Sequence, residues 1–218
     1  MIRWFRPMLA GARQGDRMIA GFGAAFGIAM TALIGIAAGL SPDLLPVIVA
    51  PMGASAVLIY AVPTSPLTQP WQVIGGNSLS ALWGLGVVGL VPHPALAAGI
   101  AVGGAILIMS ATRSLHPPGG ASALTAVIGG KAVVAAGMAF PLLVLINSVS
   151  MVVIGLAFHR LISDHAWPHR PAPPAAAPTL RRADIDAALA DMGETFDIAP
   201  ADLAALLDRA EAHAKGRG

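Results

Sequence analysis

Long apolar runs separated by short polar or proline-containing breaks fill most of the chain. Six runs can be distinguished, namely Ile19 to Leu40, Leu45 to Val62, Trp71 to Val91, Ala95 to Thr112, Leu115 to Gly130 and Phe140 to Phe158. A helix of about 20 apolar residues is long enough to cross the hydrocarbon core of a bilayer. The pattern therefore predicts an all-α membrane protein with six membrane segments.

Two of the six runs contain residues that break helices. The run Leu45 to Val62 contains Pro51, and the run Leu115 to Gly130 contains Pro117 and Pro118. Proline suits the first helical position but blocks helix continuation. We expect each run to be extended first and helical from Pro51 or Pro118, so that each forms half a helix. Irregular backbone at membrane depth is tolerated only inside protein or beside a cavity, so both breaks are expected to point inward.

Charged residues are concentrated at the two ends of the chain. Of 13 Lys and Arg and 11 Asp and Glu, only Asp43, Arg113 and Lys131 lie between residues 18 and 158. This distribution excludes a water-soluble enzyme, and the basic ends favour a cytoplasmic location for both termini rather than binding to nucleic acid. Six crossings satisfy this orientation, as do four crossings with two re-entrant loops. We expect a multi-pass protein of a bacterial inner membrane.

The chain divides into four parts by composition. Residues 1–17 form a basic N-terminus, 18–160 a transmembrane domain, 161–180 a linker rich in Pro and Ala, and 181–218 a cytoplasmic hairpin. Two amphipathic helices are expected in the hairpin, Arg181 to Met192 and Pro200 to Lys215. So short a hairpin buries little core, and we expect it to dock on a partner or a second copy. Because six short, Gly-rich spans make a small bundle, we also expect a homo-oligomer and favour a dimer.

Two short motifs recur in the same order. The segment Pro51 to Ala56 (PMGASA) recurs as Pro118 to Ala123 (PGGASA), and Asn77-Ser-Leu-Ser recurs as Asn147-Ser-Val-Ser. We interpret them as a duplication, with repeat 1 at about 19–91 and repeat 2 at about 95–158. Three segments per copy make the second copy enter from the opposite side. In transporters built as inverted repeats, two broken helices meet near the membrane midplane and form the binding site.

The broken segments carry groups that bind anions. The first turn of a helix has unpaired N–H groups and a partial positive charge, and glycine lets a ligand approach the backbone. Serine hydroxyls add donors. The predicted site for a small anion comprises Pro51, Gly53, Ala54, Ser55, His116, Pro117, Pro118, Gly119, Gly120, Ala121 and Ser122. The alternative is that Pro and Gly only kink packed helices.

The sequence leaves open the roles of four polar residues. A histidine side chain in water titrates near neutral pH, and His116 is hypothesised to carry or sense a coupled proton, or else only to hydrogen-bond the broken backbone. Asn77 and Asn147 line the pathway or join helices. Arg113 attracts anions at the inner mouth or marks the cytoplasmic boundary.

The sequence His116-Pro117-Pro118-Gly119-Gly120-Ala121 resembles the signature of the HPP family of integral membrane proteins, which is named for its first three residues. Ala50 to Ser55 and the loop Ser65 to Trp71 also resemble that family. Its plant and cyanobacterial members are associated with nitrite transport, so the resemblance implies transport of nitrite or a similar anion. The family is usually described with four transmembrane helices, two fewer than the segments counted above. Many bacterial relatives continue into nucleotide-sensing domains after a helical linker, which the hairpin resembles.

Three other functions were weighed. A sensor or scaffold would act through the C-terminal helices without transport. A membrane-embedded hydrolase would use Ser55 or Ser122 as nucleophile with His116 as base, but no acid is available to orient the histidine. A metal site from His159, His165 and His169 lacks a carboxylate cluster. We therefore expect no enzyme activity, no cofactor and no metal.

Overall fold

The structure is a computed structural model that describes residues 14–37, 39, 48–163, 166–169 and 200–215. These residues contain helices and connecting loops but no strand. The chain forms two compact units, Met1–Pro168 and His169–Gly218, which are described separately below.

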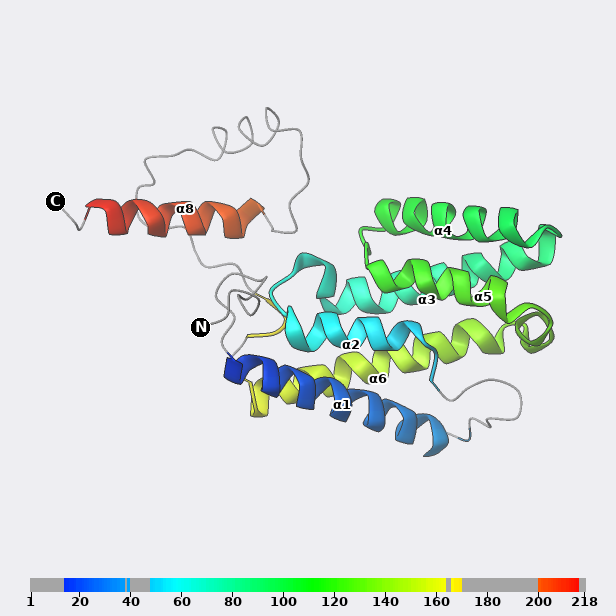
Figure 1. The fold of residues 1–218 in the computed structure, drawn as a ribbon, viewed down its shortest axis with the longest axis horizontal. Helices are drawn as coiled ribbons and strands as arrows, with labels where there is room; N and C mark the ends of the chain where they lie inside the picture. Colours follow the sequence, from blue (N-terminus) through cyan, green and yellow to red (C-terminus); the bar gives the residue numbers. More distant parts are fainter. Residues whose placement is uncertain (1–13, 38, 40–47, 164–165, 170–199, 216–218) are drawn as a thin grey trace, which may run out of the picture. The chain divides into compact units, whose positions relative to one another are not determined.

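The described residues of the first unit contain six α-helices and one short 3₁₀ helix. They are α1 (Gln14–Ala37), α2 (Pro51–Ala61), η2 (Pro66–Thr68), α3 (Pro70–Leu90), α4 (Pro94–Ala111), α5 (Pro117–Ala136) and α6 (Ala139–Leu161). Helices α2 to α5 each begin at a proline, the residue that lacks the N–H which a first helical residue leaves unpaired. Successive helices run in alternate directions along the bundle (Figure 1).

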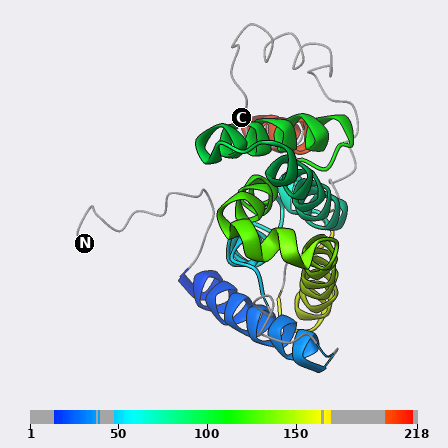
Figure 2. The same cartoon turned by 90° about the vertical axis from the view of Figure 1, so that its right-hand side faces the viewer.

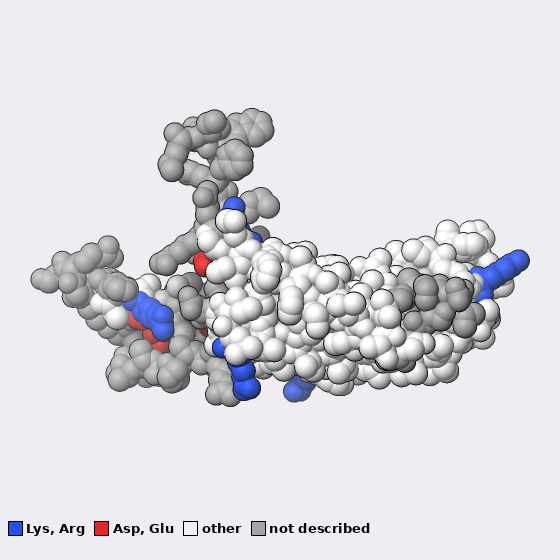
Figure 3. All heavy atoms as spheres, turned by 90° about the horizontal axis from the view of Figure 1, so that it is seen from below, with Lys and Arg blue, Asp and Glu red and all other residues white. Residues whose placement is uncertain are grey.

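Five of the described helices, α1 and α3 to α6, are long and apolar enough to cross a membrane. Helix α2 is apolar but has 11 residues, so it is about 17 Å long at 1.5 Å per residue, half the thickness of a hydrocarbon core. Over the middle of the bundle, the face drawn in Figure 3 has no charged residue, and blue atoms occur toward its ends. The chain is thus an all-α, multi-pass integral membrane protein.

The second broken segment differs from the prediction. Helix α5 begins at Pro117, one residue earlier than predicted, because the preceding His116 already has the extended conformation (φ −143°, ψ 111°). The helix also continues to Ala136 across a kink at Gly130, whose φ of +49° is readily adopted only by glycine. Gly130, the predicted end of this segment, therefore separates a first helical stretch, residues 117–129, from a short second one, residues 131–136.

The entry to α2 also differs from the prediction. The run was expected to be extended up to Pro51, but Ala50 has right-handed helical angles (φ −52°, ψ −37°). Two short-range bonds, from Met52 N to Val49 O and from Gly53 N to Ala50 O, hold Ala50 in this turn. The start of the helix at Pro51 agrees with the prediction.

The six α-helices pack as two groups. Helix α1 lies on α2 and α6, whereas α4 lies on α3 and α5. Figures 1 and 2 show α1 and α4 on opposite sides of the bundle, with the other helices between them. Contacts of α3 with α6 and of α2 with α5 join the two groups. The most extensive packing is between α3 and α5, which hold two of the four side chains of the site described below.

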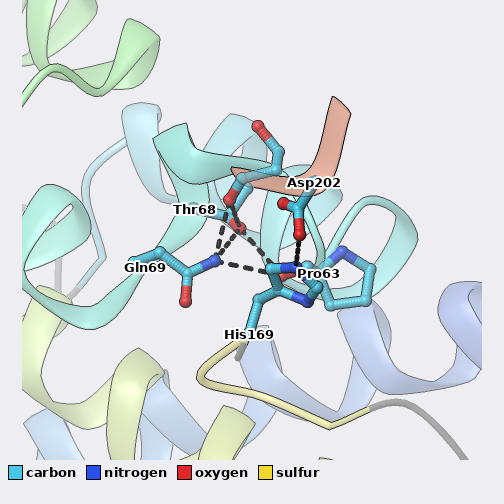
Figure 4. Close-up of polar contacts among 6 residues, drawn as sticks. Pro63, Thr68, Gln69, His169 and Asp202 are labelled. Atoms are coloured by element: carbon cyan, nitrogen blue, oxygen red, sulfur yellow. Dashed lines mark hydrogen bonds and ion pairs between the residues drawn. The ribbon is translucent and has the colours of Figure 1, made fainter. Parts of the chain in front are cut away.

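The second unit contains α8 (Pro200–Lys215), whose bounds are those expected for the second hairpin helix. Within this unit, His169 Nε2 lies 2.8 Å from Asp202 Oδ1, so Asp202 in the first turn of α8 accepts from the histidine (Figure 4). The helix expected at Arg181 to Met192 lies outside the described residues.

Candidate functional site

Four polar side chains meet inside the first unit. Ser55 of α2, Asn77 of α3, His116 before α5 and Ser122 of α5 are each fully buried, with 0% of their surface exposed. We call these four residues the polar cluster. Three of them were predicted binding residues, and Asn77 was a predicted pathway residue. The cluster brings the starts of the two proline-initiated segments together in the interior.

The hydrogen bonds of the polar cluster form one continuous chain. Ser122 Oγ donates to Asn77 Oδ1 at 2.9 Å, and Asn77 Nδ2 donates to Ser55 Oγ at 3.1 Å. Ser55 Oγ lies 2.9 Å from His116 Nε2, and His116 Nδ1 lies 2.8 Å from the carbonyl of Leu67. A carbonyl only accepts, so Nδ1 carries the hydrogen and Nε2 of the neutral ring accepts from Ser55. Every donation therefore runs in one direction, from Ser122 to Leu67.

The loop between α2 and α3 holds the Leu67 carbonyl in place. Ser65 begins η2 by accepting a hydrogen bond from Leu67 N at 3.2 Å. The Thr68 hydroxyl donates to Ser65 O at 2.8 Å, and Gln69 Nε2 lies 3.2 Å from Pro63 O and 2.8 Å from Ser65 O. Figure 4 shows Thr68 and Gln69 directed toward Pro63. These hydrogen bonds hold the Leu67 carbonyl as a fixed acceptor for His116, a role that no motif in the sequence indicates.

Glycines on α3 and α5 let the backbone pass closely enough to place His116. A Cβ on Gly76 would lie 2.6 Å from both Ser114 O and His116 Cβ, and a Cβ on Gly119 would lie 2.5 Å from Gly76 O. Real Cβ atoms do not approach other atoms so closely, so a side chain at either position would push α3 and α5 apart. The predicted site residue Gly119 thus has a packing role, as the alternative interpretation of the Gly-rich segment proposed.

Asn147 is also fully buried but makes a different contact. Its Oδ1 accepts a hydrogen bond from the backbone N–H of Val49 at 3.1 Å. Val49 lies two residues before Pro51, as His116 lies two residues before Pro118. Asn147 therefore joins α6 to the turn that enters α2, and it makes this contact outside the polar cluster.

The remaining predicted residues are divided between the interior and the surface. Pro51 and Pro118 are buried and Gly120 is partly buried, while Gly53, Ala54, Pro117 and Ala121 are exposed on the surface of the bundle. The amides of Gly53 and Gly119 donate to the carbonyls of Ala50 and His116, at 3.0 and 2.8 Å. The donors that face inward are thus side chains rather than these two helix-start amides.

Arg113 lies in the turn that links α4 to α5. It is exposed and has a left-handed conformation (φ +54°). Arg113 N bonds Ser110 O at 3.3 Å, and Ser114 N bonds Met109 O at 2.8 Å, which is the Schellman pattern of a helix end. Trp71 Nε1 also donates to Thr112 O at 3.0 Å. Arg113 is therefore the residue that ends helix α4.

The histidines that were considered for a metal site make separate contacts. His159 Nε2 contacts the carbonyl of Ile59 at 2.9 Å, and His169 pairs with Asp202 in the second unit. His165 lies outside the described residues. Among the residues that the structure describes, no group of three or more His, Cys, Asp or Glu is arranged to hold a metal ion.

The family comparison agrees with this arrangement. The family described as HPP, transmembrane region, matches residues 11–168, which include both proline-initiated segments and the whole polar cluster. The chain belongs to the HPP transmembrane family. The His-Pro-Pro sequence for which the family is named thus supplies the histidine of the polar cluster and the first two residues of α5.

Two Dictyostelium discoideum proteins that are described only as transmembrane proteins are similar to this HPP chain. One is 44% identical over 107 residues, which are 47% of this chain and 37% of that protein. The other is 42% identical over 82 residues, or 36% of this chain and 26% of that protein. The chain therefore matches just over a third of the length of the first relative and about a quarter of the second. No solved structure matches the chain.

Proposed function

We propose that this HPP protein moves a small inorganic anion across the membrane through the polar cluster. The proposal depends above all on the contact of Ser55 with His116, because it joins the starts of the two proline-initiated helices in the buried interior. Two hydroxyls and one amide of the cluster can turn their hydrogens toward a negative ligand. When no anion is present, they satisfy one another, so the buried groups stay paired.

The absence of formal charge among the four cluster side chains suits passage. Hydroxyl and amide dipoles bind an anion more weakly than a buried Lys or Arg would, and an ion that passes through must also leave. The described parts of α2 to α5 contain one Lys or Arg, Lys131, which lies beyond the kink of α5 at Gly130. The cluster is therefore suited to weak and reversible anion binding, as transport requires.

An inverted repeat is part of the proposal. Helices α1, α2 and α3 would correspond to α4, α5 and α6, and each proposed pair runs in opposite directions (Figure 1). The packing of α1 on α2 corresponds to that of α4 on α5, and the packing of α1 on α6 to that of α4 on α3. Asn77 of repeat 1 bonds Ser122 of repeat 2, and Asn147 of repeat 2 bonds the backbone of Val49 in repeat 1. The opposite directions and the matching packing of the paired helices favour two repeats related by a two-fold axis (Figure 1).

Nitrite is the proposed anion because of the resemblance to HPP members associated with nitrite transport. We further propose that the protein resides in a bacterial inner membrane with both termini in the cytoplasm, as the basic ends of the sequence favour. The alternating helix directions support an even number of crossings, because they return the end of α6 to the side on which α1 begins (Figure 1).

The experiment is anion uptake into liposomes containing the purified protein. Nitrite, nitrate, formate, chloride and bicarbonate are offered separately, and uptake by protein-free liposomes is subtracted. We expect nitrite to enter several times faster than chloride. Uptake no faster than in protein-free liposomes for every anion would refute the transport function.

One observation supports a second candidate function. Ser55 and His116 have the separation of a nucleophile and its base, and a backbone carbonyl orients the ring where a hydrolase would commonly use an acid. Ser55 lies within α2 and is fully buried, and its oxygen also accepts from Asn77. A fluorophosphonate probe distinguishes the candidates, because a hydrolase becomes labelled at Ser55 and a transporter does not.

A further inference from the structure

The direction of the hydrogen bonds in the polar cluster is set at one end. Leu67 O can only accept, so His116 Nδ1 must donate and Nε2 of the neutral ring must accept from Ser55. The Ser55 hydrogen is therefore directed at the histidine, and its oxygen accepts from Asn77 Nδ2. In this arrangement Ser55 has no hydrogen to offer an anion.

We infer that His116 Nε2 binds a proton together with the transported anion, and that this proton turns the Ser55 hydroxyl into a donor for the anion. The inference depends on the proposed transport function. A proton from water adds to the Nε2 lone pair, and no other covalent bond forms or breaks. Nε2–H then donates to Ser55 Oγ, whose second lone pair still accepts from Asn77. The hydroxyl hydrogen rotates away from the ring and needs a new acceptor.

The anion is a better acceptor for this hydrogen than the protein offers nearby. A serine in a helix can fall back on the carbonyl four residues earlier, as Ser122 does with Pro118 O at 3.3 Å. For Ser55 that carbonyl belongs to Pro51. A hydrogen bond to an anion is roughly twice as strong as a bond between neutral groups. The freed hydroxyl therefore favours an anion wherever one can enter.

Among the residues that the structure describes, the elements around His116 provide no counter-charge for a protonated ring. The elements packed around the ring are η2, α2, α3, α4 and α5, and η2, α3 and α4 contain no titratable side chain. Tyr60 of α2 packs against Phe158, with its ring close to Gly23 and Gly27 of α1. Lys131 lies beyond the kink of α5, and Arg113 is exposed. These groups are neutral or basic, so a protonated, buried His116 is stabilised only when a negative ligand binds with it.

Joint binding makes transport electroneutral. One proton and one monovalent anion cross together, so the membrane potential neither drives nor opposes the movement. For an anion that crosses without a proton, by contrast, each 100 mV changes the equilibrium ratio of its concentrations on the two sides of the membrane by about 50-fold. The dependence of uptake on voltage therefore separates coupled from uncoupled transport in the wild-type protein, without any substitution.

The test measures the initial rate of nitrite uptake into liposomes containing the full chain, after subtraction of protein-free liposomes. With potassium and valinomycin setting about 100 mV, inside negative, the wild-type rate should stay within about twofold of its value at zero potential. A severalfold fall at negative potential would overturn the inference while leaving transport established. If the wild-type protein moves no anion at any pH, the proposed function itself has failed.

A second arm varies pH between about 5.5 and 8. Wild-type uptake should rise by up to about tenfold for each unit of acidification until the histidine is saturated. His116→Gln keeps an acceptor for Ser55 but cannot be protonated, so its rate should be at least tenfold lower at acid pH and should not vary with pH. Thr125→Ala, which removes a hydroxyl of α5 that donates to Ala121 O, should retain the wild-type pH profile and serves as the control. A His116→Gln protein with the wild-type profile would overturn the inference.

Discussion

Nε2 of His116 lies 2.9 Å from the hydroxyl of Ser55, although 61 positions separate the two residues along the chain. Ser55 lies in the second turn of α2, and His116 directly precedes α5. The two helices run in opposite directions from this point (Figure 1). The contact therefore connects the starts of two helices, and a path that opens between them must break or rearrange this bond.

Gly76 is expected to be required for the position of His116. Gly76→Ala places a Cβ where Ser114 O and His116 Cβ now lie, 2.6 Å away. Overpacking of this kind lowers the free energy of unfolding by about 1–3 kcal/mol. We expect a lower melting temperature in detergent and a loss of anion uptake.

Gly86→Ala is the matched control for that substitution. Gly86 is on the same helix, and a Cβ there would meet nothing within 4 Å. Alanine also has a better helix propensity than glycine. The control should be at least as stable as the wild type, and equal melting temperatures for the two variants would show that the close approach at Gly76 is unimportant.

Asn77 is expected to couple the two serines. Asn77→Ala removes the acceptor of Ser122 and the donor to Ser55, which should lower stability by about 1–3 kcal/mol and lower uptake at least tenfold. Asn77→Asp retains the size of the side chain but loses the donor, so uptake should fall as much as in the alanine variant. If the aspartate variant transports normally, the role of Asn77 is packing alone.

The neighbouring residue provides a control for Asn77. The Ser78 hydroxyl is buried on the same helix and has no hydrogen-bond partner among the described residues. Ser78→Ala should therefore leave stability and uptake close to those of the wild type, as measured by thermal unfolding and the same uptake assay.

Arg113 is expected to affect stability through its backbone. Its φ of +54° is unfavourable for a residue with a side chain, so Arg113→Gly should raise the free energy of unfolding by about 1 kcal/mol and Arg113→Ala should not. If the charge only marks the membrane boundary, uptake by both variants should stay within twofold of the wild type. A severalfold loss in both variants would instead assign the arginine to the mouth of the pathway.

The C-terminal residues separate a transporter from a scaffold. Deleting residues 181–218 removes α8 but leaves the six helices and the polar cluster of the first unit unchanged in sequence. We expect uptake to be retained within about twofold, measured per reconstituted molecule. A protein whose uptake disappears with these residues would need them for transport, contrary to this account.

Much of this arrangement could be predicted from local patterns. The apolar runs predict the long helices, and Pro51 and Pro200 mark helix starts because proline suits the first helical position, whereas the start of α5 was predicted one residue late. The repeated PxGASA motif also identifies Ser55 and Ser122, which the structure brings into one cluster with His116.

Other features depend on contacts between distant parts of the chain. Leu67 orients His116 through a carbonyl group, and every residue has one, so no side-chain pattern identifies it. Gly76 is required because the backbone of residue 114 passes over it, a contact with no periodic signal. The continuation of α5 beyond Gly130 was missed because glycine permits both a helix end and a kink.

The most direct test of the central claim is nitrite uptake by Ser55→Ala/Ser122→Ala compared with wild type in matched liposomes. Both hydroxyls are fully buried in the polar cluster, and alanine is close to serine in volume, so the double variant should fold. A Thr125→Ala variant, which removes a hydroxyl of α5 that donates only to Ala121 O, controls for general loss of polarity. This account predicts uptake reduced at least tenfold in the double variant and unchanged in the control. Wild-type uptake by the folded double variant would contradict an anion path through the polar cluster.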